Sequence, residues 1–357
     1  MRSVSRVGDG VFRQVHAIGL RRWPLNARAT PVKARARIRW KRTPASMAAT
    51  TLAAVMVGGC GGKSDAAQNQ GNQGGLPPSH SLPGGRAPIA ALTPASTTPA
   101  VKRPRQPRAR WSVVASVGGQ PAAWIAQRSG VTLLRFDQHK LHLALHAGSH
   151  EPGGTAWTYG DRIGTHEIHR VVAAFNGGFK LNYGSVGFMA DGRVAVPLKS
   201  GLGSIVTYKD GATQIGAWHE GVPASGLGVA SVLQNLHLLV DHRVMASSVA
   251  SCIRSCWGWT LGGGSEVARS ALGIRSDGQL VWAAGKHLSP AAIGQGLVGA
   301  GAVRAVELDI NPEWIAGYLY VHHGGVPTAV PVVPGQFGIP GRLLTPYGRD
   351  FFTILAN

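Results

Sequence analysis

Three Asp-Gly dipeptides, each set between apolar runs, constrain the fold of this 357-residue chain more than any other feature. They stand at Asp191-Gly192, Asp210-Gly211 and Asp277-Gly278. Tight hairpin turns need positive φ, which aspartate tolerates and glycine adopts freely, so this dipeptide is the strongest short-range indication of a β-hairpin. The three turns predict antiparallel sheet through most of the folded part of the chain.

Other segments add strands and a helix to this sheet. Residues 131–136 and 141–146 are apolar runs on either side of Asp137, and we predict that they form a further hairpin. Residues 171–175 have the composition of a short buried strand. Ser289-Pro290 has the form of a helix start, and Gly299 and Gly301 supply the stop. We therefore predict an α+β fold, dominated by antiparallel sheet with a few packed helices.

The basic charge of the chain lies almost entirely in its first third. Residues 1–110 contain 19 Lys and Arg against 2 Asp and Glu, whereas residues 111–357 contain 17 against 14. We expect a leader over 1–60, a disordered tether over 61–110 and one globular domain over 111–357. The near-neutral domain offers no surface for tracking phosphates, so no nucleic-acid partner is expected.

The leader has the order of segments found in export signals. A basic cluster over residues 33–42 precedes an apolar run over 47–57, which is short for a membrane span. The following Val57-Gly58-Gly59-Cys60 resembles the lipobox of bacterial lipoproteins. This resemblance implies a lipid on Cys60 that anchors the protein to the outer face of the bacterial membrane. A plain secretory signal, which would release the protein, is the alternative.

Cys252 and Cys256 form an even pair in the sequence Cys-Ile-Arg-Ser-Cys. In an exported chain we predict a disulfide that closes this small loop, with free thiols as the alternative. The segment offers no further ligands for a metal.

Residues 303–311 combine an apolar and an acidic face on one predicted strand. Alternation places Val306, Leu308 and Ile310 on one side and Glu307, Asp309 and Asn311 on the other. Two carboxylates about 6 to 7 Å apart along a strand suit acid/base chemistry at a glycosidic centre. The alternative is an edge strand with a solvated acidic face.

A glycine pair follows the buried strand over 171–175. Asn176 and Lys180 frame Gly177 and Gly178, which allow positive φ and a close approach of backbone to a ligand. An ordinary hairpin turn would have the same composition.

A second candidate is Arg269, which has small neighbours on its own strand face in the run 268–274. The space beside it would fit a planar contact to phosphate or carboxylate, although a surface arginine paired with an acid would look the same.

The histidines give no metal signature. His142 and His146 share a predicted strand face, and His166 and His169 have a spacing that is not that of a metalloprotease. We expect exposed strand histidines, no metal and no cofactor.

Taken in order, four motifs resemble those of the phosphodiester glycosidase family, which includes N-acetylglucosamine-1-phosphodiester α-N-acetylglucosaminidases. They are Ala-Phe-Asn-Gly-Gly-Phe at 174–179, the run 234–241 with Asn235, the run 268–278 with Arg269, and Glu307-Leu-Asp309. The resemblance covers residues 131–357 and implies an active site with Asn176, Arg269 and Asp309. One motif departs from the family, because Ile-Asn-Pro follows Asp309 in place of three glycines.

The resemblance implies cleavage of a sugar-1-phosphate diester at the anomeric carbon. In this hypothesis Arg269 holds the phosphodiester anion, Asp309 stabilises or attacks the anomeric centre or activates water, and Glu307 provides acid/base help or a sugar contact. Substrate-binding positions are expected at Asn176, Asn311, Lys180 and Asn235. The alternative is an envelope lipoprotein that binds glycans without turnover, and a third hypothesis is a histidine-dependent metalloprotein.

Overall fold

The computed structural model describes residues 109–260 and 263–357, and this part of the chain is mainly β. The predicted α+β class is therefore corrected, because within these described ranges helices contribute only three short segments and one turn of 3-10 helix. The predicted leader, Cys60 and nearly all of the tether lie outside the described residues.

The strands are β1 (Ser112–Val117), β2 (Gln120–Arg128), β3 (Val131–Phe136), β4 (Leu141–His146), β5 (Val171–Asn176), β6 (Val186–Ala190), β7 (Arg193–Val196), β8 (Gly203–Tyr208), β9 (Thr213–Ala217), β10 (Val229–Asn235), β11 (Leu238–Asp241), β12 (Val244–Met245), β13 (Val267–Arg275), β14 (Leu280–Leu288), β15 (Ala302–Glu307), β16 (Gly317–Val321), β17 (Thr328–Pro331) and β18 (Phe351–Ala356). The helices are α1 (Ser248–Ser251), α2 (Ile253–Trp257), α3 (Pro290–Gly299) and the 3-10 helix η1 (Arg342–Leu344).

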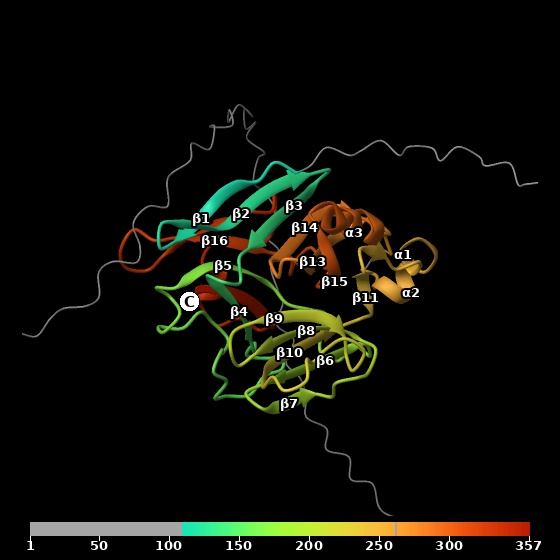
Figure 1. Cartoon of the computed structure of the whole chain (residues 1–357), viewed down its shortest axis with the longest axis horizontal. Coiled ribbons are helices and arrows are strands. Elements are labelled where there is room, and N and C mark those ends of the chain that lie inside the picture. The colour runs from blue at the N-terminus through green and yellow to red at the C-terminus, as the bar shows by residue number, and fades with distance from the viewer. Residues whose placement is uncertain (1–108, 261–262) are drawn as a thin grey trace, which may run out of the picture. The chain divides into compact units, whose positions relative to one another are not determined.

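These strands form three sheets. An eight-stranded sheet has the order β1-β2-β3-β14-β13-β15-β11-β12, and two five-stranded sheets have the orders β7-β6-β10-β8-β9 and β17-β16-β5-β18-β4. Figure 1 shows the eight-stranded sheet in the upper part of the view and the sheet with β6 to β10 in the lower part. The largest core cluster joins all three sheets, and in its aromatic centre Phe175 stacks with Phe136 and with Trp282 at centroid distances of 6.3 and 5.3 Å.

All three Asp-Gly dipeptides connect antiparallel neighbours, which confirms the predicted hairpins. They join β6 to β7, β8 to β9 and β13 to β14. Asp191 and Gly192 both have positive φ, of 52° and 70°, as a turn of this kind requires.

The predicted hairpin around Asp137 is wrong, although both of its strands form. β3 pairs with β2 and β14 in the eight-stranded sheet, whereas β4 pairs with β18 in another sheet. Both strands are buried on both faces, so each needs long-range neighbours rather than only its sequence neighbour. The turn after Asp137 therefore carries the chain from one sheet to the next.

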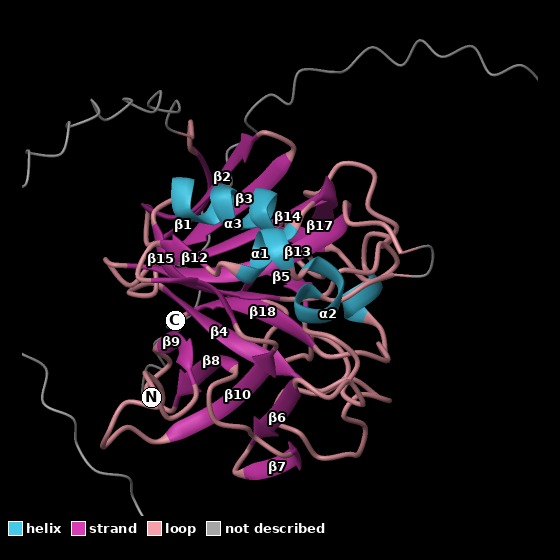
Figure 2. Ribbon diagram, turned by 90° about the vertical axis from the view of Figure 1, so that its right-hand side faces the viewer, coloured by secondary structure: helices cyan, strands magenta, loops and turns pink. Residues whose placement is uncertain are grey.

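The predicted helix is confirmed as α3. The Ser289 hydroxyl accepts a hydrogen bond from the Ala292 backbone N–H, and Pro290 occupies the first turn. Ile293 and Leu297 are fully buried against the eight-stranded sheet. Figure 2 shows α1, α2 and α3 grouped beside this sheet.

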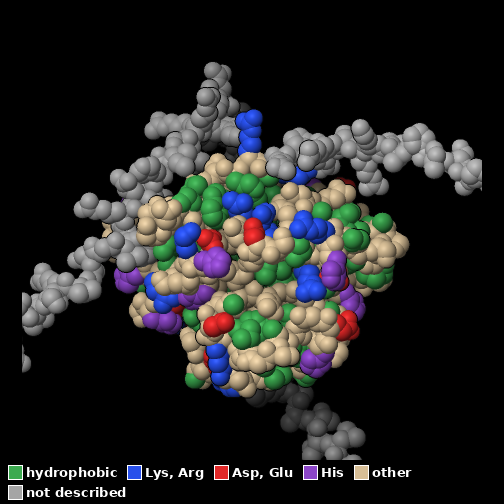
Figure 3. Space-filling model, viewed as in Figure 1, with side chains coloured by type: hydrophobic (Ala, Val, Ile, Leu, Met, Phe, Trp, Pro, Cys, Tyr) green, Lys and Arg blue, Asp and Glu red, His purple; other side chains and the backbone are tan. Residues whose placement is uncertain are grey.

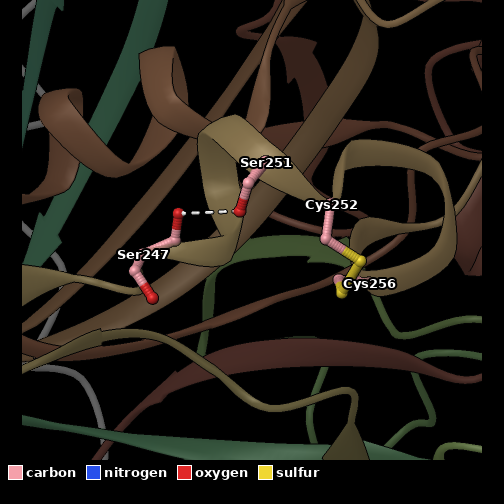
Figure 4. Close-up of a disulfide and its surroundings, with 4 residues drawn as sticks. All are labelled: Ser247, Ser251, Cys252 and Cys256. Carbon is pink, nitrogen blue, oxygen red and sulfur yellow. Dashed lines mark hydrogen bonds between the residues drawn. A yellow bond between two sulfur atoms is a disulfide. The ribbon is translucent and has the colours of Figure 1, made fainter.

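Figure 4 shows the disulfide between Cys252 and Cys256, with an S–S distance of 2.02 Å. This is the pair for which the sequence predicts a disulfide. The disulfide closes the first turn of α2. In the preceding helix α1, the Ser251 hydroxyl lies 3.5 Å from the Ser247 carbonyl oxygen.

The surface mixes charges of both signs. On the face shown in Figure 3, lysine and arginine side chains are interspersed with acidic side chains and histidines. Within residues 109–260 and 263–357, no helix has the length and apolar composition needed to cross a membrane.

Candidate active site

Strands from all three sheets end near Gly177. β5 ends at Asn176, β10 ends at Asn235 and β15 ends at Glu307. The Gly177 N–H donates to the Asp350 carbonyl at 3.1 Å, and the Gly177 carbonyl accepts from the Asp309 N–H at 3.1 Å. The segments that the sequence singled out, 176–178 and 307–309, are therefore neighbours.

The acidic strand is central rather than exposed. β15 lies between β13 and β11, so the edge-strand alternative is wrong. The regular strand stops at Glu307, earlier than predicted, and Leu308 continues by donating its N–H to the Ser270 carbonyl at 2.8 Å. Residues on both faces of 306–310 are buried, so the acidic face packs inside the protein and does not face solvent.

Glu307 and Arg269 form one buried ion pair. Their closest atoms, Oε1 and Nη1, are 2.6 Å apart, and neither side chain is exposed. Arg269 also donates to the backbone carbonyls of Leu288 and Trp257 at 2.9 and 3.0 Å. The predicted contact of Arg269 with a substrate phosphate stays a prediction, and it would require this pair to open.

Asp309 belongs to a second charged group, here called the Arg349 cluster, which contains the buried Asp309, Arg349 and Asp350 and the half-buried Glu151. The Arg349 guanidinium lies 3.1 Å from Asp309 Oδ2 and 2.7 Å from Glu151 Oε2. It also donates to the Gly178 carbonyl at 2.8 Å. Asp350 Oδ2 accepts from the Gly178 N–H at 2.9 Å. Nη1 of Arg349 and Oδ1 of Asp350 have no hydrogen-bond partner among the described residues.

In this cluster the carboxyl groups of Asp309 and Glu151 pair with the Arg349 guanidinium, whose charge also acts on the Asp350 carboxyl group. Burial raises the pKa of Asp350 to about 7, opposed by Arg349 and reinforced by Asp309 and Glu151. Burial likewise raises the pKa of Asp309 to about 6, opposed by Arg349 and by the N–H groups of Asn311 and Ile310. In the other pair, burial raises the pKa of Glu307 to about 7 against the lowering effect of Arg269. Carboxyl groups with pKa values near neutrality are suited to holding and releasing protons.

Arg349, Asp350 and Glu151 are site residues that the sequence did not predict. Arg349 and Asp350 precede β18, which reaches the site only because it pairs with β5 over a long sequence distance. Glu151 lies in the long connection between β4 and β5. The adjacent Arg349-Asp350 charges ahead of an apolar strand are the one local feature that could have suggested them.

The predicted binding residues differ in accessibility. Asn235 is fully buried; its amide donates to the Glu307 carbonyl at 2.7 Å, and its oxygen accepts from the Phe179 N–H at 3.1 Å. Asn176 donates to Ser270 Oγ at 2.8 Å. Asn311 is half-buried and accepts from the Glu313 N–H, whereas Lys180 is exposed. Their roles toward a substrate stay predictions; in this structure Asn235 fastens the glycine turn to the acidic strand.

The glycine pair makes room for a side chain rather than for a turn of positive φ. Neither Gly177 nor Gly178 has positive φ. A Cβ added to Gly177 would lie 1.9 Å from Asp350 Oδ2. Glycine is therefore required at 177 because the Asp350 carboxyl group occupies the space that a side chain would fill.

One expectation about the histidines is wrong. His146 is completely buried, with Nε2 2.9 Å from Glu167 Oε1 and the ring stacked on Phe351 at 4.1 Å. β4 carries it inside because the strand pairs with β18 and is covered on both faces. Within 109–260 and 263–357, no group of three or more His, Cys, Asp or Glu side chains is arranged to hold a metal ion.

Two hollows border the site region. A cavity of about 40 Å³ is lined by Asn176, Trp314 and Tyr347 among others, which is room for about one water molecule. A larger hollow of about 310 Å³ is lined by Tyr183, Arg254, Ser255 and Trp259. The first adjoins the buried groups, and only the second approaches the volume of a ligand site.

The raised pKa values predict that stability depends on pH. Asp309 and Asp350 keep their protons to a higher pH in the folded protein than in the unfolded chain. Between about pH 4 and 7 the folded state binds more protons, so this contribution to the free energy of unfolding is present at low pH and is lost as pH rises. For Asp309 alone the difference is roughly 3 kcal/mol. Urea denaturation across this range measures the slope, and Asp350→Asn should flatten it; an unchanged slope would contradict the assigned pKa of Asp350.

Fold and site together define a mainly β protein with a buried acidic centre organised around an arginine. No model of a known protein family matches the chain, and no curated protein matches it in sequence. Among solved structures, the zebrafish N-acetylglucosamine-1-phosphodiester alpha-N-acetylglucosaminidase catalytic domain, auto-inhibited by its pro-peptide, is similar with a TM-score of 0.44, 13% identity, and coverage of 70% of this chain and 88% of that chain. A hypothetical protein from Synechocystis is similar with a TM-score of 0.37, 14% identity, and coverage of 71% and 65%. At these TM-scores the likenesses assign neither a family nor a function.

Proposed function

We propose that this protein is a hydrolase that cleaves glycosyl phosphodiester bonds in envelope glycans or glycolipids. The observation that carries the proposal is the Arg349 cluster, in which the Arg349 guanidinium lies 3.1 Å from the Asp309 carboxyl group and its Nη1 has no hydrogen-bond partner within the part of the chain that the structure describes. A phosphodiester anion and a developing positive charge at the anomeric carbon need these two charges side by side.

The roles follow from charge and protonation. Arg349 binds the phosphodiester, with Arg269 as the alternative cation that the sequence motifs favour. Asp309 has a pKa of about 6 and is mostly ionised at neutral pH, so it stabilises or attacks the anomeric centre or activates water. Cleavage of the bond from the anomeric carbon to oxygen releases a phosphate monoester, which needs little acid help. Asp350, with a pKa of about 7, carries a proton that can be supplied to this site, and Glu307 is the second candidate for that role.

We also propose that the protein acts outside the cytoplasm. The basic, apolar and small-residue order of residues 33–60 supports export, with a lipid on Cys60 as the anchor and release by a plain secretory signal as the alternative.

Asp309→Asn tests the activity. We expect the full-length variant to lose release of sugar from a GlcNAc-1-phosphodiester by roughly 10³-fold or more, because the substitution removes the charge at the anomeric centre and keeps the shape. Chromatography of the released sugar measures this. Asp210→Asn is the matched control, because Asp210 is exposed and Asn-Gly forms the same turn. Turnover that survives Asp309→Asn would contradict the assigned role.

The second candidate is a glycan-binding protein without turnover. It is favoured by the burial of Asp309, Arg349 and Asp350, which are at most 7% exposed, and by the pairing of Arg349 with Asp309 at 3.1 Å. This candidate predicts saturable calorimetric binding with no product, whereas the hydrolase predicts product formation from the same substrate.

A further inference from the structure

The hollow next to the glycine turn combines exposed aromatic rings with positive charge. Trp259 is 61% exposed and Tyr183 is 38% exposed, although large apolar side chains usually avoid water. Both line the same hollow with Arg254 and Ser255, and none of these four residues is acidic. Lys180, which is also exposed, accepts the Tyr183 N–H at its carbonyl at 2.8 Å and so belongs to the same turn.

The hollow is fastened to its surroundings. Phe179 supports Tyr183 edge-on, with ring centroids 5.2 Å apart and planes at 88°. The disulfide of Cys252 and Cys256 brackets Arg254 and Ser255, which fixes the helix that presents them. The Tyr183 ring and the helix that carries Arg254 and Ser255 are therefore held in place without a ligand, which lowers the ordering cost of binding.

The segment that carries Trp259 also packs against the candidate active site. Gly258 precedes Trp259 and has φ of +72°, and a Cβ there would lie 2.8 Å from Ile310 Cδ1 and from Phe179 Cζ. The carbonyl of Trp257 accepts from Arg269, the partner of Glu307. Ile310 follows Asp309 in the chain, so the hollow and the acidic strand share a packed boundary.

From these observations we propose that the hollow is a subsite for one pyranose unit of an anionic glycan. The sugar face packs on the Trp259 indole, and Arg254 with Lys180 attracts the adjoining phosphate. A volume of about 310 Å³ suits a single sugar ring, at the lower end of the range for small-ligand sites, and is small for a protein interface. Aromatic walls with a few polar groups are typical of such sites, and arginine is suited to phosphate. The inference rests on the proposed function for the identity of the glycan as a glycosyl phosphodiester.

Calorimetry on the full-length chain tests the subsite. The probes are a GlcNAc-1-phosphodiester, a neutral oligomer of N-acetylglucosamine, and inorganic polyphosphate that contains no sugar. We expect Trp259→Ala to raise the Kd for both sugar probes by roughly tenfold, comparable to the loss of one aromatic contact. Arg254→Gln should weaken binding of the phosphodiester and leave the neutral oligomer unchanged. The matched controls are Val326→Ala, an apolar side chain that is 69% exposed, and the exposed Arg162→Gln.

The outcomes separate this inference from the proposed hydrolase. Equal affinity of Trp259→Ala and the unaltered chain for both sugar probes overturns the subsite, as does the absence of binding by the unaltered chain. An equal loss of polyphosphate binding in Trp259→Ala also overturns it, because no sugar is then involved. Binding that depends on Trp259 without any turnover by the unaltered chain supports the subsite and contradicts the hydrolase. If Asp309→Asn loses turnover while Trp259→Ala keeps both turnover and binding, the result supports the hydrolase and not the subsite.

Discussion

Arg349→Met should leave the protein severely destabilised at pH 8 and recover much of its stability at pH 5. The substitution keeps most of the side-chain volume but removes the cation that pairs with Asp309 and Glu151 and lowers the pKa of Asp350. Asp309 and Asp350 are 5% and 1% exposed, so their charges lose a partner without gaining water. Removing one member of a buried ion pair costs about 3 to 5 kcal/mol.

The sign of the pH effect is specific to this arrangement. Without Arg349, the folded-state pKa values of Asp309 and Asp350 rise further above those of the unfolded chain, because Arg349 lowers both in the intact protein. The stability of the variant is therefore retained at low pH and lost as pH rises through these higher values. Urea denaturation at several pH values between 5 and 8 measures this dependence.

Two variants control this result. Arg349→Lys keeps the charge and should show a much weaker dependence on pH. Arg304→Met breaks an ion pair with Asp241 whose members are 30% and 48% exposed, and it should change the free energy of unfolding by at most about 1 kcal/mol. Equal stability of Arg349→Met at pH 5 and pH 8 would show that the carboxyl groups do not depend on this cation.

The parts of the fold that the sequence predicted are those in which local chemistry decides the conformation. Each Asp-Gly turn and the Ser289-Pro290 helix start depends on a few adjacent residues, and each formed as expected. The hairpin predicted around Asp137 is wrong because the turn is compatible with β4 joining either of two sheets. Which sheet β4 joins is decided by β18 at the far end of the chain.

The candidate site likewise has features that the local sequence predicts and features that depend on distant neighbours. Asp309 and Glu307 stand out in sequence because two acids alternate with apolar residues on a strand. Their burial on both faces follows from the neighbours β13 and β11, which the local pattern does not contain. Arg269 was expected to face a ligand. The residues next to it in sequence cannot show that Glu307 and three backbone carbonyl groups surround its guanidinium.

At Gly177 and Gly178, the sequence and the packing give different reasons for the presence of glycine. In sequence, Asn-Gly-Gly predicts freedom of the backbone. In the structure, the same glycines have ordinary φ and are required because Asp350 approaches them from β18. A residue type was therefore predicted as important for a reason that differs from the one that the packing shows.

We accordingly expect Gly177→Ala to destabilise the protein by roughly 3 to 5 kcal/mol, since it combines overpacking with the loss of buried hydrogen bonds. The added Cβ would lie 1.9 Å from Asp350 Oδ2 and 2.8 Å from the Asp350 carbonyl oxygen, so both the side chain and the backbone must move. That movement breaks the bonds from the N–H groups of Gly177 and Gly178 to Asp350. Urea denaturation measures the loss.

Gly184→Ala provides the matched control, because no atom lies within 4 Å of its added Cβ and its φ is not positive. It should change the stability by less than about 1 kcal/mol, since only the unfolded chain is affected. The double variant Gly177→Ala with Asp350→Ala isolates the cause: removing the carboxyl group makes space for the new methyl group, so the combined loss should be smaller than the sum of the two single losses. Simple additivity would mean that the methyl group and the Asp350 carboxyl group do not compete for the same space, and the position assigned to Asp350 beside Gly177 would then be wrong.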